Sequence, residues 1–378
     1  MRRALLVLLL ASAPVRAAAQ SSQFGVRGLG MPGRSLSTSA FGAGGAFGLF
    51  DPGSGLNPAA LGRVTALAAG LSGVQDFRHV ENPAGTESLR ETRFPFVSVA
   101  GPIRNSPGVV GISFSNYTSR DFTLATADTV PLRDVLVPVS DTFSARGGLS
   151  DLRFGGAYRL QDTWVFGGSF HVITGSNRVR FRRTFADSAY ESNTQSSELS
   201  YAGVGVSLGI IRNFGTALSV AATVRSDGHL NVDRDSARVA TTDLPYTFGL
   251  GVRWRPAAKL DLATQLLVKT WSAANSDLIA QGGTGSENTF EVSLGGEFTP
   301  DPRHPTRRPL RFGARYGALP FSVVQGEQPH EFGLSLGTGI RFAQERAGVD
   351  LGLEHVWRSA GAHSERALLL NIGMTVRP

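Results

Sequence analysis

Residues 246–255 read Tyr-Thr-Phe-Gly-Leu-Gly-Val-Arg-Trp-Arg, and this stretch decides the fold. Every second residue, from Tyr246 to Trp254, is large and apolar, while the residues between them are small, hydroxylic or basic. Successive side chains of a strand point to opposite faces, so a period of two predicts a β-strand with one apolar and one polar face. The stretches 331–342 and 366–377 alternate in the same way.

The length of these stretches distinguishes a membrane wall from a soluble sheet. Strands of soluble proteins average about 5–6 residues, whereas a tilted strand that crosses a bilayer needs about 9–11. The stretches quoted above run for 10 or 12 residues. Aromatic residues such as Trp164, Tyr246 and Trp254 lie near segment ends, as the interfacial girdles of a membrane barrel require. We therefore expect the apolar faces to contact lipid.

Fourteen segments of this kind follow residue 63. They are 64–72, 94–101, 108–119, 149–160, 163–174, 198–212, 215–227, 245–255, 259–271, 289–300, 310–320, 330–342, 348–358 and 366–377. Short connections (161–162, 213–214, 256–258) alternate with long ones (120–148, 175–197, 228–244, 272–288). Outer-membrane barrels have an even strand number, short periplasmic turns and longer outer loops. We therefore predict an all-β protein, a 14-stranded antiparallel transmembrane β-barrel.

Two segments do not fit clearly into this alternation of strands and connections. The stretch from Val179 to Phe185 is either an additional strand or the extension of a hairpin above the membrane. The stretch 301–309 contains three prolines, which exclude a regular helix or strand, so we expect an irregular loop there.

The first 19 residues predict the compartment. Two arginines, an apolar stretch at 4–13 and small residues at 17–19 form the pattern of a secretory signal peptide, so the mature chain should begin near Gln20. The sequence contains no cysteine, which excludes a lipoprotein anchor, disulfides and thiolate metal sites. Together with the strand pattern, the signal predicts the cell outer membrane of a Gram-negative type of envelope.

The charges and polar residues indicate no enzyme and no nucleic-acid partner. The net charge is +7, but nearly all basic residues are arginines spread along the chain, and only Lys259 and Lys269 are lysines. Phosphates of outer-membrane lipid are possible contacts for them. The histidines show no ligand spacing, so we expect neither metal nor cofactor. No serine lies in a nucleophile-elbow motif; a deacylase with a Ser–His pair on the wall is the remaining enzymatic alternative.

Residues 20–63 do not alternate. They are rich in glycine, alanine and phenylalanine and lack the polar bias of a disordered tail. An ordered apolar segment before a barrel can be buried inside the barrel. The sequence therefore predicts three parts, a signal peptide (1–19), a small N-terminal plug in the lumen (20–63) and the barrel (64–378).

Three short motifs of the plug carry a family resemblance. They are Arg-Gly-Leu-Gly-Met at 27–31, Gly-Gly-Ala-Phe at 44–47 and Asn-Pro-Ala-Ala-Leu at 57–61. The segment resembles the FadL-type outer-membrane transporters of hydrophobic compounds, and equally their relatives, the PorV/PorQ proteins of the type IX secretion system. The chain departs from the pattern at Ser35–Ser39, at a single acidic residue, Asp51, and at its end, which lacks the terminal aromatic residue that the barrel-assembly machinery commonly reads.

The resemblance implies passive transport of small hydrophobic, fatty acid-like compounds, gated by a hatch at Asn57, Pro58 and Ala59. A turn that ends the plug is the simpler interpretation of the same three residues. The alternative function is a PorV/PorQ-like component of type IX secretion, with secretion-system proteins as partners, and a purely structural barrel is a third. The ligand path would include three apolar side chains, which could instead only pack the plug: Phe41, Phe47 and Phe50.

A lateral opening of the wall is a further possibility. Pro95 removes a backbone donor at the start of the predicted second strand, and Gly108 and Gly111 begin the third. Together these residues could interrupt strand pairing and let a lipophilic molecule leave sideways. The simpler interpretation is that Pro95 marks a strand end.

Overall fold

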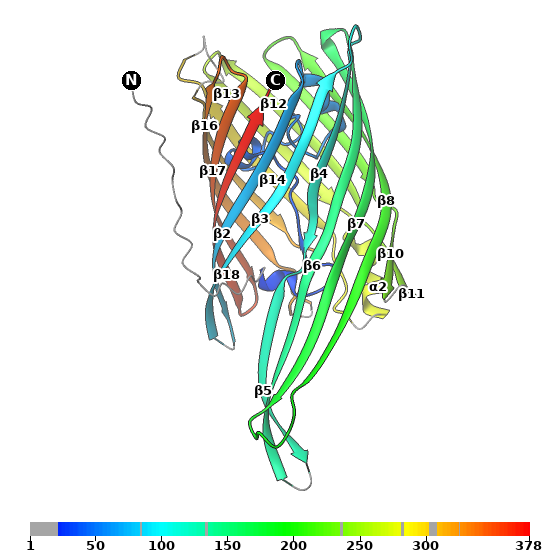
Figure 1. Ribbon diagram of the computed structural model, residues 1–378. Coiled ribbons are helices and arrows are strands. Elements are labelled where there is room, and N and C mark those ends of the chain that lie inside the picture. Colours follow the sequence, from blue (N-terminus) through cyan, green and yellow to red (C-terminus); the bar gives the residue numbers. More distant parts are fainter. Residues whose placement is uncertain are drawn as a thin grey trace, which may run out of the picture.

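A computed structural model describes residues 22–83, 85–132, 135–234, 237–280, 283–301, 308–324 and 326–378 (Figure 1). The predicted signal peptide lies outside these residues, as does most of the proline-containing loop at 301–309. Among the described residues, no helix is long and apolar enough to span a membrane.

The chain forms a closed antiparallel barrel of fourteen strands. They are β2 (Ala68–Asn82), β3 (Gly85–Pro102), β4 (Gly108–Ser119), β6 (Val135–Leu160), β7 (Trp164–Phe185), β8 (Asn193–Phe214), β9 (Leu218–Ser226), β12 (Tyr246–Ala257), β13 (Leu260–Lys269), β14 (Thr289–Phe298), β15 (Leu310–Ala318), β16 (His330–Phe342), β17 (Ala347–Ala360) and β18 (His363–Val376). The last strand pairs with the first, from Val376 opposite Ala69 to Ser364 opposite Glu81. The predicted fold class is confirmed.

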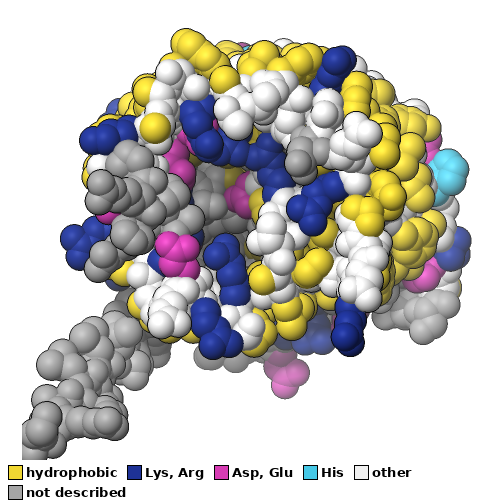
Figure 2. Space-filling view, turned by 90° about the horizontal axis from the view of Figure 1, so that it is seen from above, with side chains coloured by type: hydrophobic (Ala, Val, Ile, Leu, Met, Phe, Trp, Pro, Cys, Tyr) yellow, Lys and Arg dark blue, Asp and Glu magenta, His cyan; other side chains and the backbone are white. Residues whose placement is uncertain are grey.

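The alternating faces point as expected. The outward side chains Leu208, Leu250 and Leu336 are 62%, 59% and 63% exposed, which is the arrangement of a lipid-facing wall. Polar residues occupy the inner face, where Glu354 and Glu365 are each 1% exposed. Viewed from above, hydrophobic side chains surround the circumference and basic ones gather around the mouth (Figure 2).

Several strand boundaries differ from the prediction, beginning with those of the first two strands. The first strand begins at Ala68 rather than at residue 64. The 3-10 helix η2 (Pro58–Arg63) ends directly before Val64, and because Val64 is its C-cap, the strand starts only after it. The second strand begins at Gly85 rather than at residue 94. Residues 85–93 read Gly-Thr-Glu-Ser-Leu-Arg-Glu-Thr-Arg, so they lack an apolar face and gave no alternating signal.

The long connections at one end of the barrel, here called the outer end, contain more structure than expected. The predicted loop 120–148 holds β5 (Phe122–Leu132), which pairs with the outer half of β6. The stretch from Val179 to Phe185 is the outer part of β7, hence a hairpin extension and not an additional strand. β5 and the outer parts of β6, β7 and β8 form an arm that projects from the barrel (Figure 1). Smaller elements fill the other connections: β10 (His229–Arg234), β11 (Ala237–Asp243), η3 (Gln161–Thr163), η4 (Trp271–Ala274) and α2 (Asn275–Ala280).

The plug runs along the lumen from the outer end to the inner end, where the short turns lie. It contains η1 (Gln23–Gly25), β1 (Met31–Pro32), α1 (Thr38–Gly42) and η2. At the outer end the Ser22 hydroxyl donates to Glu365 of β18 at 2.8 Å. At the inner end η2 leads directly into β2.

Candidate functional site

Asn57 fixes the inner end of the plug. Its side chain is 1% exposed; its amide nitrogen donates to the Leu49 carbonyl at 3.0 Å, and its oxygen accepts from the Ala59 backbone N–H at 3.0 Å. The second bond caps η2, in which Pro58 occupies the first turn, where its missing N–H costs nothing. The three predicted hatch residues thus lie together, as the start of a short, buried helix.

Glycines of the wall allow η2 to lie directly against it. A Cβ atom on Gly167 of β7 would lie 2.3 Å from the Ala59 nitrogen, and one on Gly209 of β8 would lie 1.9 Å from the Asn57 side-chain oxygen. Around this contact the interior is packed with apolar side chains, among them Leu49, Phe50, Ala60, Leu61, Val165 and Ile211. The inner end of the plug is therefore held against this part of the wall by apolar packing.

The three phenylalanines of the predicted ligand path lie in different environments. Phe41, on α1, packs against Val74, Val356 and Leu369 and lines an outer cavity. Phe50 belongs to the apolar packing at the inner end, where the Arg63 guanidinium lies over its ring. Phe47 is half-buried beneath the Arg253 guanidinium. Of the three, only Phe41 lines this cavity.

The outer cavity has a volume of about 160 Å³. One side is apolar and includes Pro32, Leu36, Phe41, Leu56, Val74, Trp271 and Leu369. The other side carries charged residues of the wall, such as Arg93, Glu291 and Arg358. The Trp271 indole N–H is buried and has no hydrogen-bond partner among the described residues.

A chain of ion pairs crosses the inner face of the wall from β15 to β3. Arg315 contacts Glu354 at 2.6 Å and also Glu331; Arg358 contacts Glu331 at 3.0 Å and also Glu365; Arg78 contacts Glu365 at 3.2 Å and also Asp76; Arg93 contacts Asp76 at 3.4 Å. We call these residues the ionic ladder. Most of them are almost completely buried, so each charge depends on its neighbours for compensation.

Arg34 connects the plug to the ladder. Its guanidinium lies 3.2 Å from Glu354 and 3.2 Å from Glu291, and it also donates to the Gly44 carbonyl at 3.0 Å. Within the plug, Asp51 accepts hydrogen bonds from Ser37 and, at 2.9 Å, from Ser39. Two of the serines that depart from the family pattern, Ser37 and Ser39, therefore bond to the single aspartate, while Ser35 bonds to Ser115 of the wall at 3.1 Å.

The wall is incompletely paired beside the outer cavity. Pairing between β3 and β4 runs from Pro102 opposite Val109 to Phe96 opposite Ser115 and does not continue to residues 85–95. A bulge lies directly beside Phe96, the last residue of β3 that pairs with β4. There Gly73 of β2 faces two residues of β3, Phe94 and Pro95.

The plug takes the place of β3 at this point. Met31 and Pro32 of β1 pair with Ser119 and Thr118 of β4, and the Gly33 N–H donates to the Tyr117 carbonyl at 2.8 Å.

The three residues predicted for a lateral opening are therefore separated. Pro95 lies where the pairing ends, adjacent to Phe96. Gly108 begins β4, and Gly111 pairs with Ala100 inside the paired part. Of the three residues predicted to form the opening, Pro95 lies at the interruption of strand pairing, and Gly108 and Gly111 do not.

A polar chain beneath the plug was not predicted from the sequence. His171 lies 3.0 Å from Asp151 through Nδ1 and 2.9 Å from the Ser207 hydroxyl through Nε2. This is the connectivity of a hydrolase triad. However, Ser207 is 4% exposed and His171 is 0% exposed, and Arg225 also binds Asp151 at 2.7 Å. The residues come from three different strands, so only their inward parity on β6, β7 and β8 could have grouped them.

A second cavity, of about 250 Å³, lies near the inner end. Its lining includes Asp51, Arg63, Ser98, Arg341 and Arg377 and shares no residue with the lining of the outer cavity. The plug lies between the two cavities.

Comparisons with known proteins identify the architecture. A family model described as BamG matches residues 1–231 and 216–366. No curated protein matches the sequence. A FadL homologue of Pseudomonas aeruginosa superposes with a TM-score of 0.64 at 12% identity, covering 92% of this chain and 99% of that one. The toluene transporter TbuX of Ralstonia pickettii gives 0.59 at 12% identity, with 91% and 98% covered. The monoaromatic hydrocarbon channel CymD gives 0.58 at 15% identity, with 91% and 98% covered. At these identities the structural likeness shows a FadL-like fold.

Proposed function

The chain belongs to the BamG family, and from its FadL-like fold and the geometry of the lumen we propose that it carries small hydrophobic compounds across the outer membrane by passive diffusion. The observation that carries the proposal is the position of the outer cavity. Its lining includes Met31, Pro32 and Gly33, the plug residues that replace β3 as the partner of β4. A molecule in this cavity is therefore separated from the lipid by one short, replaceable strand.

The size of the cavity favours a compact ligand. An apolar cavity of about 150 Å³ accommodates a molecule of the size of benzene. The outer cavity has a similar volume. A long-chain fatty acid would require the cavity to enlarge toward the interruption between β3 and β4.

In this proposal the plug has a fixed part and a moving part. Asn57, Pro58 and Ala59 hold the inner end closed, so they act as a seal and not as the moving element. Phe41 forms part of the ligand site, while Phe47 and Phe50 pack the plug. Release occurs sideways at Pro95 when β1 leaves β4; Gly108 and Gly111 have no part in it. The proposed surroundings are outer-membrane lipid and, during insertion, the barrel-assembly machinery.

A disulfide between β1 and β4 tests this proposal. The chain contains no cysteine, so Met31→Cys with Ser119→Cys introduces a single pair at directly opposite positions. Opposite residues of antiparallel strands lie about 4.5–5.5 Å apart, within the range that a disulfide spans. We expect uptake of radiolabelled styrene and oleate by intact cells to fall to background under oxidising conditions and to return after reduction.

The matched control places the disulfide in the paired part of the same two strands. Ser98→Cys with Ser113→Cys joins residues that already face each other across β3 and β4, and it should leave uptake unchanged. Undiminished uptake by the oxidised Met31–Ser119 variant would show that β1 is not the gate. Uptake no higher than in host cells without the chain would contradict transport itself.

A second candidate function follows from two other observations. The two cavities share no lining residue, and an arm of strands projects from the outer end. A PorV/PorQ-like protein, which would anchor secreted proteins instead of conducting ligands, is expected to have a filled lumen and an exposed protein-binding surface on its outer loops. Shortening the arm separates the alternatives. It leaves uptake unchanged in a transporter, and it abolishes surface display of secreted proteins in an anchoring protein.

A further inference from the structure

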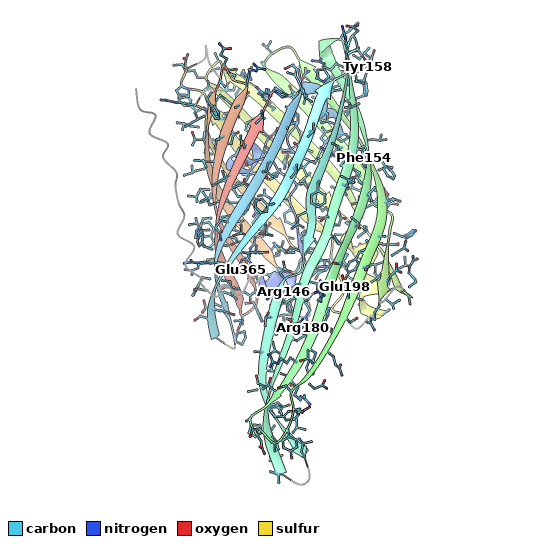
Figure 3. The ribbon with its side chains drawn as sticks, viewed as in Figure 1. Arg146, Phe154, Tyr158, Arg180, Glu198 and Glu365 are labelled. Carbon is cyan, nitrogen blue, oxygen red and sulfur yellow. The ribbon has the colours of Figure 1, made fainter. Side chains whose placement is uncertain are left out.

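The outward face of β6, β7 and β8 changes character along its length. On β7 the outward residues are Trp164, Phe166, Phe170 and Val172, then Thr174 and Ser176, and finally Arg178, Arg180 and Arg182. On β6 the outward residues pass from Tyr158 and Phe154 through Ser150 to Arg146. The register of these strands contains no shift from the barrel to the arm, so all these side chains share one continuous face. Figure 3 shows this order from Tyr158 and Phe154 in the barrel to Arg146 and Arg180 in the arm.

The arginines begin just beyond the apolar band. From Trp164 to Val172 the strand is nine residues long, about the length that crosses a bilayer at a tilt. Arg178 follows Thr174 by four residues, which at a rise of about 3.3 Å and a tilt of about 45° corresponds to roughly 9 Å further outward. The headgroup layer occupies roughly 5–8 Å on each side of the hydrocarbon core. Arg178 and, opposite it, Arg146 therefore lie at the outer edge of the headgroup layer, while Arg180 and Arg182 lie roughly 14 Å and 19 Å beyond Thr174.

Within the arm the arginines are more numerous than their acidic partners. Arg146 and Arg178 lie directly opposite each other on β6 and β7, an arrangement of like charges that is unfavourable in isolation. Glu198 of β8 forms an ion pair with Arg178 at 3.2 Å and compensates its charge. No described acidic residue pairs with Arg146, Arg180 or Arg182.

Hydroxyl groups flank two of these arginines. Ser144 and Ser196 lie on either side of Arg180, and Thr142 and Thr194 lie on either side of Arg182. Guanidinium groups bind phosphate oxygens through paired hydrogen bonds, and serine and threonine hydroxyls add further donors to such oxygens.

We propose that Arg146, Arg178, Arg180 and Arg182, here called the arginine face, bind the phosphate groups of glycolipids in the outer leaflet. The opposite face of the same arm provides a contrast. There Arg183 is paired with Asp141 at 2.6 Å, beside aromatic side chains such as Phe143 and Phe181. The arm thus neutralises the arginine that faces away from the lipid and leaves three on the lipid side without an acidic partner. Binding there holds the arm upright against the headgroups.

A titration of the full chain tests the proposal. The protein, purified in a nonionic detergent, is titrated with diphosphorylated lipid A, with the same lipid after removal of both phosphates, and with inorganic phosphate. The triple variant Arg146→Gln, Arg180→Gln, Arg182→Gln should bind diphosphorylated lipid A about 100-fold more weakly, from about fivefold for each surface arginine. The dephosphorylated lipid should bind the unmodified chain about as weakly.

Two further variants keep the test decisive. Arg183→Gln removes the same charge from the opposite face of the same strand and should change the affinity by less than about twofold. Replacing Arg146, Arg180 and Arg182 by lysine keeps the charge and should retain most of the binding, which separates loss of charge from misfolding of the arm. The proposal is overturned if the glutamine variant binds normally, if Arg183→Gln weakens binding equally, or if inorganic phosphate displaces the lipid at comparable concentration.

Discussion

The two ends of the plug are attached to the wall by different physical means. At the inner end, η2 lies against Gly167 and Gly209 in an apolar environment with no space for a methyl group. At the outer end, Arg34 and Ser22 bind carboxylates of the wall, and β1 forms a two-residue ladder with β4.

This difference assigns distinct mobilities to the two ends. Close packing resists displacement, because any movement loses many small contacts at once. Ion pairs and short ladders can exchange their bonds with water or with a ligand one at a time, so they open at lower cost. We therefore propose that the plug is a fixed seal at its inner end and a latch at its outer end.

The largest effect is expected at the seal. Gly167→Ala places a Cβ atom 2.3 Å from the Ala59 nitrogen, and because that atom belongs to the backbone, η2 must move. We expect destabilisation by roughly 1–3 kcal/mol, the usual cost of overpacking, and ion leakage in planar bilayers. The matched control is Gly168→Ala, one residue along the same strand, whose Cβ would have its nearest neighbour at 3.6 Å. Equal stability of the two variants would mean that η2 is not held by close packing.

A smaller effect is expected at the latch. Arg34→Gln should cost about 1–2 kcal/mol, less than the roughly 3–5 kcal/mol of breaking a fully buried pair. The reduction is expected because the Arg34 side chain is 21% exposed and Glu354 retains Arg315. Hydrogen exchange should accelerate in residues 24–36 and remain unchanged in 57–63. Equal acceleration in both segments would show that the plug moves as one body.

The smallest effect, none at all, is expected for the chemistry of the polar chain between the two ends. Ser207 lies two residues from Gly209 on β8, toward the outer end of the barrel and on its inner face. The plug should therefore shield it from reagents in solution. A fluorophosphonate probe should leave Ser207 unmodified, as judged by the mass of the peptide that contains it. The purified Ser207→Ala variant should hydrolyse a test ester at the same background rate as the unmodified chain. A mass increase on that peptide would reveal an accessible nucleophile and restore the enzymatic alternative.

The sequence predicts those strands whose two faces meet different solvents. β12, β16 and β18 alternate clearly, since one face contacts lipid and the other the polar lumen. The outer part of β3 and the whole of β5 lie above the membrane, where water can reach both faces and no alternation is required. Their hairpin pairing is visible only in the structure.

The site is predictable only where it is local in sequence. Asn57 followed by proline predicts a capped helix, and both hydrogen bonds of the Asn57 side chain join residues no more than eight positions apart. The bond from Arg34 to Glu354 joins residues 320 positions apart, and the chain from Asp151 to Ser207 uses three strands. Each of these residues is one polar side chain on the inner face of its strand, and only the register of the closed barrel brings them together.

Both ends of the plug are joined to the same pair of strands. Ser22 binds Glu365 on β18, and residue 63 is followed after four residues by β2, the strand that pairs with β18 to close the cylinder. Separation of β2 from β18 would therefore carry the two ends of the plug apart, one with each strand. We expect the lumen to be filled during biogenesis as the ring closes, when the first and last strands meet.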